Sequence, residues 1–195
     1  MIRTASITRR TAETKITATL GIDGTGQSEI ATGIGFFDHM LILFTKHGLF
    51  DVNLSADGDL FVDGHHTVED VGIVLGQAFA EALGDKSGIK RYGTAFVPMD
   101  EALIMVSLDI SGRPFLAFDV EIPTQRIGTF DSELTEEFLR ALAVHAGLTL
   151  HVRLMAGKNA HHIVEGVFKA LGRALDEATR KDERIVGVMS TKGML

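Results

Sequence analysis

The sequence predicts an α+β fold made of two similar halves, each with a mainly antiparallel sheet that helices cover on one face. The first observation is a repeat: HHTVE at residues 65–69 returns as HHIVE at residues 161–165, and the eighteen-residue windows that begin at these two boxes share ten residues. The second is that the same order of strands, helix and strand precedes each box. We therefore expect an internal duplication, with residues 1–88 and 89–195 as the halves of one compact domain, packed helix side to helix side.

In the first half, period-2 and helical patterns follow one another. Ile16, Ala18, Leu20 and Ile22 alternate with small or polar residues, as in a half-buried strand, and the apolar residues between 37 and 44 recur at helical spacing. The expected strands are 2–8, 15–22, 29–32 and 50–54, and the expected helices are 35–47 and 65–83. After the DGTGQ turn, the strand at 29–32 is expected to close a hairpin or meander. Gly84 is placed to end the second helix.

The second half begins beyond GDKSGIKRYG at residues 84–93, the one stretch that resembles a linker. Pro114 suits the start of a strand because it lacks the amide donor that a central position needs. The expected strands are 95–97, 102–109, 115–120 and 148–155, and the expected helices are 132–146 and 161–179. The order of elements thus matches that of the first half.

Composition narrows the class of protein. A net charge of −7 argues against nucleic acid or an anionic membrane as the main partner. The chain has no cysteine, which excludes thiolate ligands and nucleophiles. No apolar run approaches the ~20 residues of a membrane span, and the N-terminus lacks the apolar core of a secretory signal. We expect a soluble, cytoplasmic protein.

The two boxes are candidate metal sites. On a helix, Glu69 shares a face with His65 or His66, and the second box repeats this arrangement. Adjacent histidines diverge by about 100°, so the two of a pair are badly placed to share one ion. Two such helices meeting would give two sites, each with imidazoles and carboxylates from both copies. Nitrogen and oxygen ligands without sulfur suit Mn, Fe or Zn. The alternative is that the histidines are helix-start or core residues.

Several cations could hold an anion beside such a site. Lys169 follows Glu165 by one helical turn, although an ordinary Glu–Lys pair explains this spacing equally well. Arg91, Arg113 in SGRP, and Ser190 with Lys192 in STKG occur in loop contexts where they could grip a phosphate. Taken singly, each is an ordinary surface residue.

Motifs along nearly the whole chain resemble those of the imidazoleglycerol-phosphate dehydratase family of histidine biosynthesis. The matching segments, in order, are RRTAET, GFFDHML, DGHHTVEDVGIVLG, PMDEAL, SGRP, LTLHV, HHIVEGVFKALGRAL and STKG. The resemblance implies two divalent metal ions per active site, usually manganese, and a homo-oligomer of 24 subunits whose sites are shared between subunits. The implied metal ligands are His39, His65, His66, Glu69, His161, His162 and Glu165.

The resemblance also implies further site residues, and this chain departs from the family pattern at Glu137 and at Leu43, where many members have glutamine. Glu13 matches an active-site glutamate, and the phosphate-binding positions match Arg91, Arg113, Lys169, Ser190 and Lys192. Where many members have a metal-binding histidine, this chain has Glu137. Because a carboxylate still binds a hard or borderline cation, we expect Glu137 to remain a ligand, with altered affinity.

The implied reaction removes water from imidazoleglycerol phosphate and gives imidazole-acetol phosphate. The proton on carbon 2 of the side chain is not next to a carbonyl and has no ready electron sink. Lewis-acid metals on the imidazole would favour the imidazolate, which can push out the hydroxyl on carbon 3 before a carboxylate takes the proton from carbon 2. We expect Glu165 to be the base, with Glu13 as its rival and Asp100 as a candidate proton shuttle. Two other functions remain open: a two-metal hydrolase of a phosphorylated small molecule, and a metal-storage protein, in which the phosphate-type cations would have no role.

Overall fold

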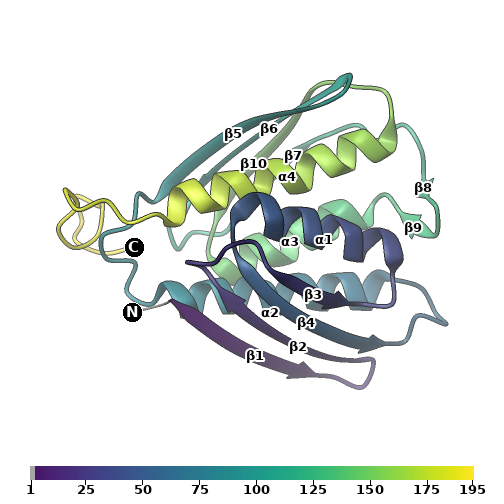
Figure 1. Cartoon of the computed structure of the whole chain (residues 1–195), viewed down its shortest axis with the longest axis horizontal. Coiled ribbons are helices and arrows are strands. Elements are labelled where there is room, and N and C mark those ends of the chain that lie inside the picture. Colours follow the sequence, from purple (N-terminus) through teal and green to yellow (C-terminus); the bar gives the residue numbers. More distant parts are fainter. Residues whose placement is uncertain (1–2) are drawn as a thin grey trace.

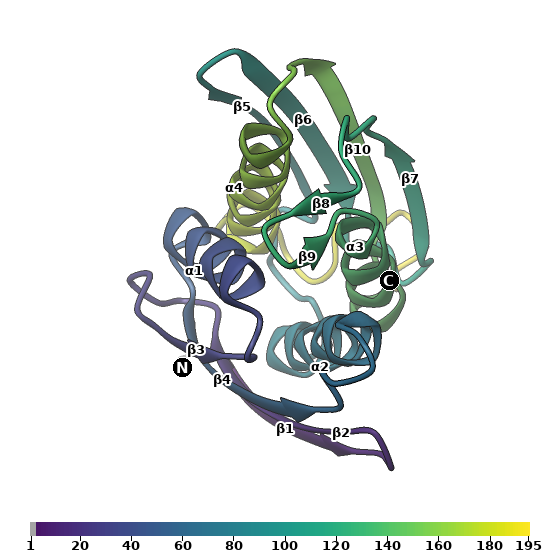
Figure 2. The same cartoon turned by 90° about the vertical axis from the view of Figure 1, so that its right-hand side faces the viewer.

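The computed structural model describes residues 3–195, so Ile2, expected to open the first strand, lies outside the described residues. Two four-stranded sheets form the outer layers, and the helices fill the space between them (Figures 1 and 2). Each sheet therefore carries helices on one face only, and the helical sides of the two halves meet. This confirms the predicted α+β architecture.

The first sheet has the order β1-β2-β4-β3. Its strands are β1 (Thr4–Arg10), β2 (Thr14–Gly21), β3 (Ser28–Ala31) and β4 (Asp51–Gly58). The β1–β2 and β2–β4 pairs are antiparallel, but β3 pairs with β4 in parallel. The expected hairpin or meander at β3 is therefore wrong. A helix separates β3 from β4, and β4, whose Val52 and Leu54 are buried, takes the central place beside β2.

The second sheet repeats this topology in the order β5-β6-β10-β7. Its strands are β5 (Tyr92–Met99), β6 (Ala102–Asp109), β7 (Phe115–Asp119) and β10 (Thr149–Ala156), with β7 parallel to β10. β5 is longer than expected and begins inside the segment that resembled a linker. A short hairpin of β8 (Arg126–Ile127) and β9 (Phe130–Asp131) was not predicted.

Four helices pack in two pairs between the sheets. They are α1 (Gly35–Gly48), α2 (His65–Leu83), α3 (Leu134–Ala146) and α4 (Ala160–Thr179). α1 packs on α4, and α2 packs on α3. The bounds of α2 match the prediction, and Gly84 follows it at φ 56°, a left-handed φ that a residue without Cβ adopts readily. Phe37 of the first half contacts Phe138 and Phe168 of the second, at ring-centroid distances of 5.3 and 6.3 Å. The two halves thus share one core.

The helices of each pair run in parallel (Figure 1), and a close glycine contact in each pair shows that the pairs are equivalent. A Cβ at Gly172 of α4 would lie 2.4 Å from the carbonyl oxygen of Phe44 and 3.0 Å from the amide nitrogen of Gly48. A Cβ at Gly76 of α2 would lie 2.9 Å from the oxygen of Leu142 and 3.0 Å from the nitrogen of Ala146. Position 44 of α1 therefore corresponds to 142 of α3, and His39 corresponds to Glu137.

Among residues 3–195, the helices are all too short or too polar to cross a bilayer.

Candidate active site

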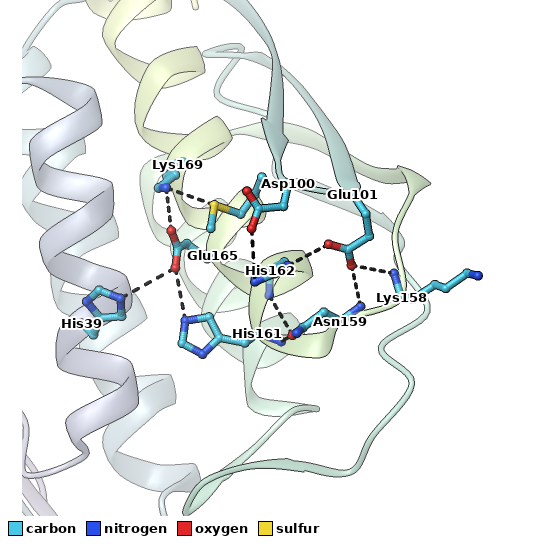
Figure 3. Close-up of polar contacts among 10 residues, drawn as sticks. His39, Asp100, Glu101, Lys158, Asn159, His161, His162, Glu165 and Lys169 are labelled. Carbon is cyan, nitrogen blue, oxygen red and sulfur yellow. Dashed lines mark hydrogen bonds and ion pairs between the residues drawn. The ribbon is translucent and has the colours of Figure 1, made fainter.

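The second box opens α4, and its two histidines diverge as helix geometry requires. The side chain of Asn159 caps the helix by accepting hydrogen bonds from the backbone amides of His161 and His162. The two imidazole rings are 6.3 Å apart and almost perpendicular, at 82°. Figure 3 shows His161 turned toward α1 and His162 turned toward the β5–β6 turn. The two rings of the first box, at His65 and His66, are likewise 6.2 Å apart at 88°.

His39, His161 and Glu165 form what we call the α1–α4 cluster, in which one potential ligand atom from each residue lies within 4.8 Å of the others. Oε2 of Glu165 is 3.2 Å from Nε2 of His161 and 3.8 Å from Nε2 of His39 (Figure 3). The parallel packing of α1 on α4 brings His39 to this place. In the sequence, only the family resemblance indicated His39 as a ligand.

Lys169 holds the other oxygen of Glu165, with 2.5 Å between Nζ and Oε1. Burial of Glu165 is the largest influence on its pKa and acts to raise it, but the hydrogen bonds and charges of Lys169 and His161 together outweigh burial and lower the pKa of Glu165. The residue therefore stays ionised, as a metal ligand must. In the single chain, Lys169 makes the Glu–Lys pair that the sequence left as an alternative to anion binding.

Glu13, Asp59 and His66 form a second grouping, here called the β1–β2 turn cluster. Asp59 lies 3.0 Å from Nδ1 of His66, and Glu13 lies 3.8 Å from it. The hydrogen bond with Asp59, aided by the charge of Glu13, raises the pKa of His66. Sequence reasoning missed Asp59, because an aspartate in the loop ADGDLFVDG looks like any turn residue.

The second half has a counterpart around His162. Glu101, in the β5–β6 turn, lies 2.7 Å from Nδ1 of His162 and also accepts the backbone amides of Lys158 and Asn159 (Figure 3). The hydrogen bond from His162 is the largest cause that lowers the pKa of Glu101 to about 2. Asp100, the candidate shuttle, lies 3.7 Å from Nε2 of His162, on a backbone with φ 49°. Glu101 was not predicted; its position directly after Asp100 in PMDEAL was the available signal.

The expected site that combines both boxes does not form within one chain. Neither cluster contains residues of both α2 and α4, because α2 packs on α3 while α4 packs on α1. His65, Glu69 and Glu137 join neither cluster among the described residues. Glu137 instead lies 3.8 Å from Arg140, one turn further along α3.

The predicted phosphate-binding residues separate into two places. Arg91 makes two bonds to Asp109, Nε to Oδ1 at 2.6 Å and Nη2 to Oδ2 at 2.9 Å, and donates to the carbonyl of Met189 at 2.7 Å. Arg113 approaches the same aspartate at 3.9 Å. Ser190 follows Met189, and its hydroxyl accepts the backbone amide of Lys192 at 3.2 Å. Lys169 is apart from these, beside Glu165 and Met99. Sequence reasoning missed Asp109.

The α1–α4 cluster fits a divalent cation by its donor atoms, and the β1–β2 turn cluster offers the imidazole of His66 with carboxylates that hold it. Each combines imidazole nitrogen with carboxylate oxygen and lacks sulfur. Zn, Mn and Fe accept such ligand sets. In the β1–β2 turn cluster, the carboxylate on Nδ1 of His66 orients the ring and leaves Nε2 as the nitrogen available to a metal.

The fold and the clusters define an internally duplicated α+β protein with histidine–carboxylate sites at the starts of its helices. A family model described as imidazoleglycerol-phosphate dehydratase matches residues 32–175. Imidazoleglycerol-phosphate dehydratases of Acetivibrio thermocellus and Thermoanaerobacter pseudethanolicus are each 63% identical to the chain, over 195 and 194 residues, covering 100% of both sequences in each case. The chain therefore belongs to the imidazoleglycerol-phosphate dehydratase family, whose members are hydro-lyases of histidine biosynthesis.

Solved structures agree with this conclusion. The enzyme from Staphylococcus aureus is 43% identical with a TM-score of 0.84, covering 92% of this chain and 99% of its own. The enzyme from Pyrococcus furiosus is 41% identical with a TM-score of 0.85, covering 97% and 100%.

Proposed function

We propose that the chain catalyses the metal-dependent loss of water from imidazoleglycerol phosphate, which gives imidazole-acetol phosphate, in the cytoplasm. The observation that carries this proposal is the pair of histidine–carboxylate clusters, placed by a duplicated fold in a chain of this family. The cofactor is two divalent cations per active site, with manganese as the first candidate. The residues that would hold them are His39, His65, His66, Glu69, Glu137, His161, His162 and Glu165.

The protein groups beside the histidines support this ligand set. Carboxylates hold Nδ1 of His66 and of His162 at 3.0 and 2.7 Å. Such carboxylates fix the ring and increase its basicity, as they do beside metal-binding histidines generally. A histidine kept only for packing would not need the same arrangement in both halves.

The two candidate bases have different surroundings. When bound, the cations would supply Lewis acidity toward the imidazole ring of the substrate. Both oxygens of Glu165 are engaged, one by Lys169 and one by His161, and its pKa is lowered. The carboxylate of Glu13 is half-exposed and accepts no hydrogen bond among the described residues, while lying 3.8 Å from His66. This contrast favours Glu13 as the group that takes the proton from carbon 2, with Glu165 as a ligand and Asp100 as the candidate shuttle.

The separation of the two boxes within one chain supports sites that are completed between subunits. A second copy of the chain would bring the α1–α4 cluster of one subunit to the β1–β2 turn cluster of another. The same step would bring Arg91, Arg113, Ser190 and Lys192 near Lys169, so that the phosphate is held by cations from more than one subunit. We therefore propose a large homo-oligomer as the active form.

Metal analysis with a dehydration assay tests the proposal. We expect two manganese ions per subunit, loss of activity with a chelator, and formation of an enolisable ketone. Release of inorganic phosphate would favour a hydrolase instead, and many ions per subunit without turnover would favour metal storage.

Comparing Glu13→Gln with Glu165→Gln separates the two carboxylates. We expect Glu13→Gln to lower kcat by ~10²–10⁴-fold while metal content is kept, as for loss of a general base. We expect Glu165→Gln to lose metal together with activity. If Glu13→Gln turned over like the wild type, Glu13 would not be the base.

A further inference from the structure

Asp70 of α2 is a buried carboxylate, 6% exposed, that belongs to neither metal cluster. Each of its oxygens is bound by a different residue of the β1–β2 hairpin. Nε of Arg9 donates to Oδ1 at 2.9 Å, and the hydroxyl of Thr14 donates to Oδ2 at 2.5 Å. Arg9 precedes the turn and Thr14 follows it, so Asp70 ties both sides of the turn to the helix.

The turn between these anchors is itself closely bonded. The hydroxyl of Thr11 accepts the amides of Glu13 and Thr14 at 3.1 and 2.9 Å, and the amide of Thr11 donates to the carbonyl of Thr14 at 2.9 Å. Glu13 therefore has a fixed backbone and a carboxylate without a hydrogen bond among the described residues. From this fixed backbone the carboxylate lies 3.8 Å from Nδ1 of His66.

The second half anchors the equivalent turn differently. The counterpart of Asp70 in the repeat is Gly166, where a Cβ would meet Cγ1 of Ile104 at 2.8 Å, so there is no room for a carboxylate. Its turn is held by Glu101, which bonds both His162 and the start of α4. In the second half one carboxylate both anchors the turn and faces the histidine. In the first half these two tasks fall to different residues.

We propose that Asp70 is a positioning residue, which clamps the β1–β2 turn to α2. The clamp keeps the carboxylate of Glu13 beside His66 and leaves that carboxylate free of hydrogen bonds within the turn. The buried pair of bonds fixes the turn, and the free carboxylate can then exchange a proton with substrate. This inference rests on the proposed function for the part that concerns catalysis; the anchoring of the turn does not depend on it.

Asp70→Asn tests the clamp because it keeps the shape of the side chain and replaces one acceptor oxygen by an amide. The first measurement is hydrogen exchange. We expect faster exchange of the amides of residues 11–15, whereas those of α4 keep their protection. Unchanged exchange in the turn would overturn the proposal, whether or not the protein has dehydratase activity. An inactive wild type would instead contradict the proposed function alone.

Kinetics supply the second measurement, in the metal-loaded protein. A misplaced catalytic group can cost on the order of 10²-fold in rate, so we expect Asp70→Asn to lower kcat by roughly 10–100-fold, with KM and metal content little changed. In a Glu13→Gln background, Asp70→Asn should have almost no further effect, because the group it positions is already lost. Losses that multiply in the double variant would show that Asp70 acts through general stability and would overturn the proposal.

Two further variants separate the clamp from stability. Val74→Ala, on the same helix and fully buried, should lower Tm without changing kcat. Thr14→Ser keeps the hydroxyl that bonds Asp70 and should turn over like the wild type, whereas Thr14→Val should behave like Asp70→Asn. Equal turnover by the serine and valine variants would count against the clamp.

Discussion

Replacing Gly172 by alanine should force α1 away from α4. A Cβ at this position would lie 2.4 Å from the carbonyl oxygen of Phe44, and real Cβ contacts essentially never fall below 3.0 Å. The neighbouring atom is backbone, so no side chain can rotate away. The two helices must therefore separate by at least ~0.6 Å, about the distance by which that contact falls short.

The stability change can be estimated from two opposing effects. Overpacking of this kind costs about 1–3 kcal/mol. Alanine is a better helix former than glycine by about 0.8–1.0 kcal/mol, which offsets part of that cost. Gly35, the first residue of α1, provides a matched control, because a Cβ there would meet nothing within 4 Å. The difference between Gly172→Ala and Gly35→Ala thus isolates the clash, at about 1–3 kcal/mol.

Thermal unfolding and metal binding measure this prediction. For a chain of this size, 1 kcal/mol shifts Tm by about 2–4 °C, so Gly172→Ala should unfold roughly 2–12 °C below Gly35→Ala. His39 and Glu165 are only 3.8 Å apart across the same helix pair, so affinity for manganese should fall as well. If the two variants had the same Tm and the same metal affinity, the close approach of α1 and α4 would be needed neither for stability nor for metal binding.

Three other predictions follow from single contacts. The hydrogen bonds from Arg3 lower the pKa of Asp23 below 3.8. Their stabilising effect is therefore present above that pH and is lost as the pH falls through the lowered pKa. Asp23→Asn should reduce Tm at pH 7, and the difference in Tm from the wild type should disappear in acid. A gap that stayed constant with pH would contradict this. Glu137→Ala should reduce bound manganese, measured by elemental analysis, and full metal content with full activity would remove Glu137 from the ligands. Asp109→Asn replaces one of the two carboxylate oxygens that hold the Arg91 guanidinium in place, so KM for the phosphorylated substrate should rise several-fold. Tm should fall as well, because the pair is largely buried. An unchanged KM would separate Arg91 from phosphate binding.

The sequence predicted the parts of the fold that depend on local pattern. The bounds of α2 and β6 were predicted to the residue, because apolar spacing and a following glycine or turn mark them. Strand partners are not encoded locally, which is why the parallel pairing of β3 with β4 was missed. The repeated box indicated the duplication, and its position after matching strands in each half indicated where the helices begin.

Sequence reasoning found the histidines of the site and the glutamates of the two boxes, but it missed several carboxylates that lie around them. A doubled HHxxE box is rare enough to be noticed, whereas Asp59, Glu101 and Asp70 are single acidic residues that could equally be solvated. Only the fold brings Asp59 to His66 and Glu101 to His162, across loops that differ in length between the halves. The role of such residues is set by their neighbours in space, and sequence spacing does not reveal those neighbours: Asp59 lies close to His66 in the chain, but Glu101 lies far from His162.

All four helices begin at the same end of the molecule. Residues next to the starts of α1, α2 and α3, Ile34, Gly64 and Leu134, line one pocket, and Phe36 of α1 lies 5.2 Å from His161 at the start of α4. Their peptide dipoles therefore add, and each helix start carries about half a positive charge. This potential repels any cation that approaches the histidines. The carboxylates of Glu69, Glu137 and Glu165 oppose it, so a glutamate at 137 leaves this end of the molecule less positive than a histidine would.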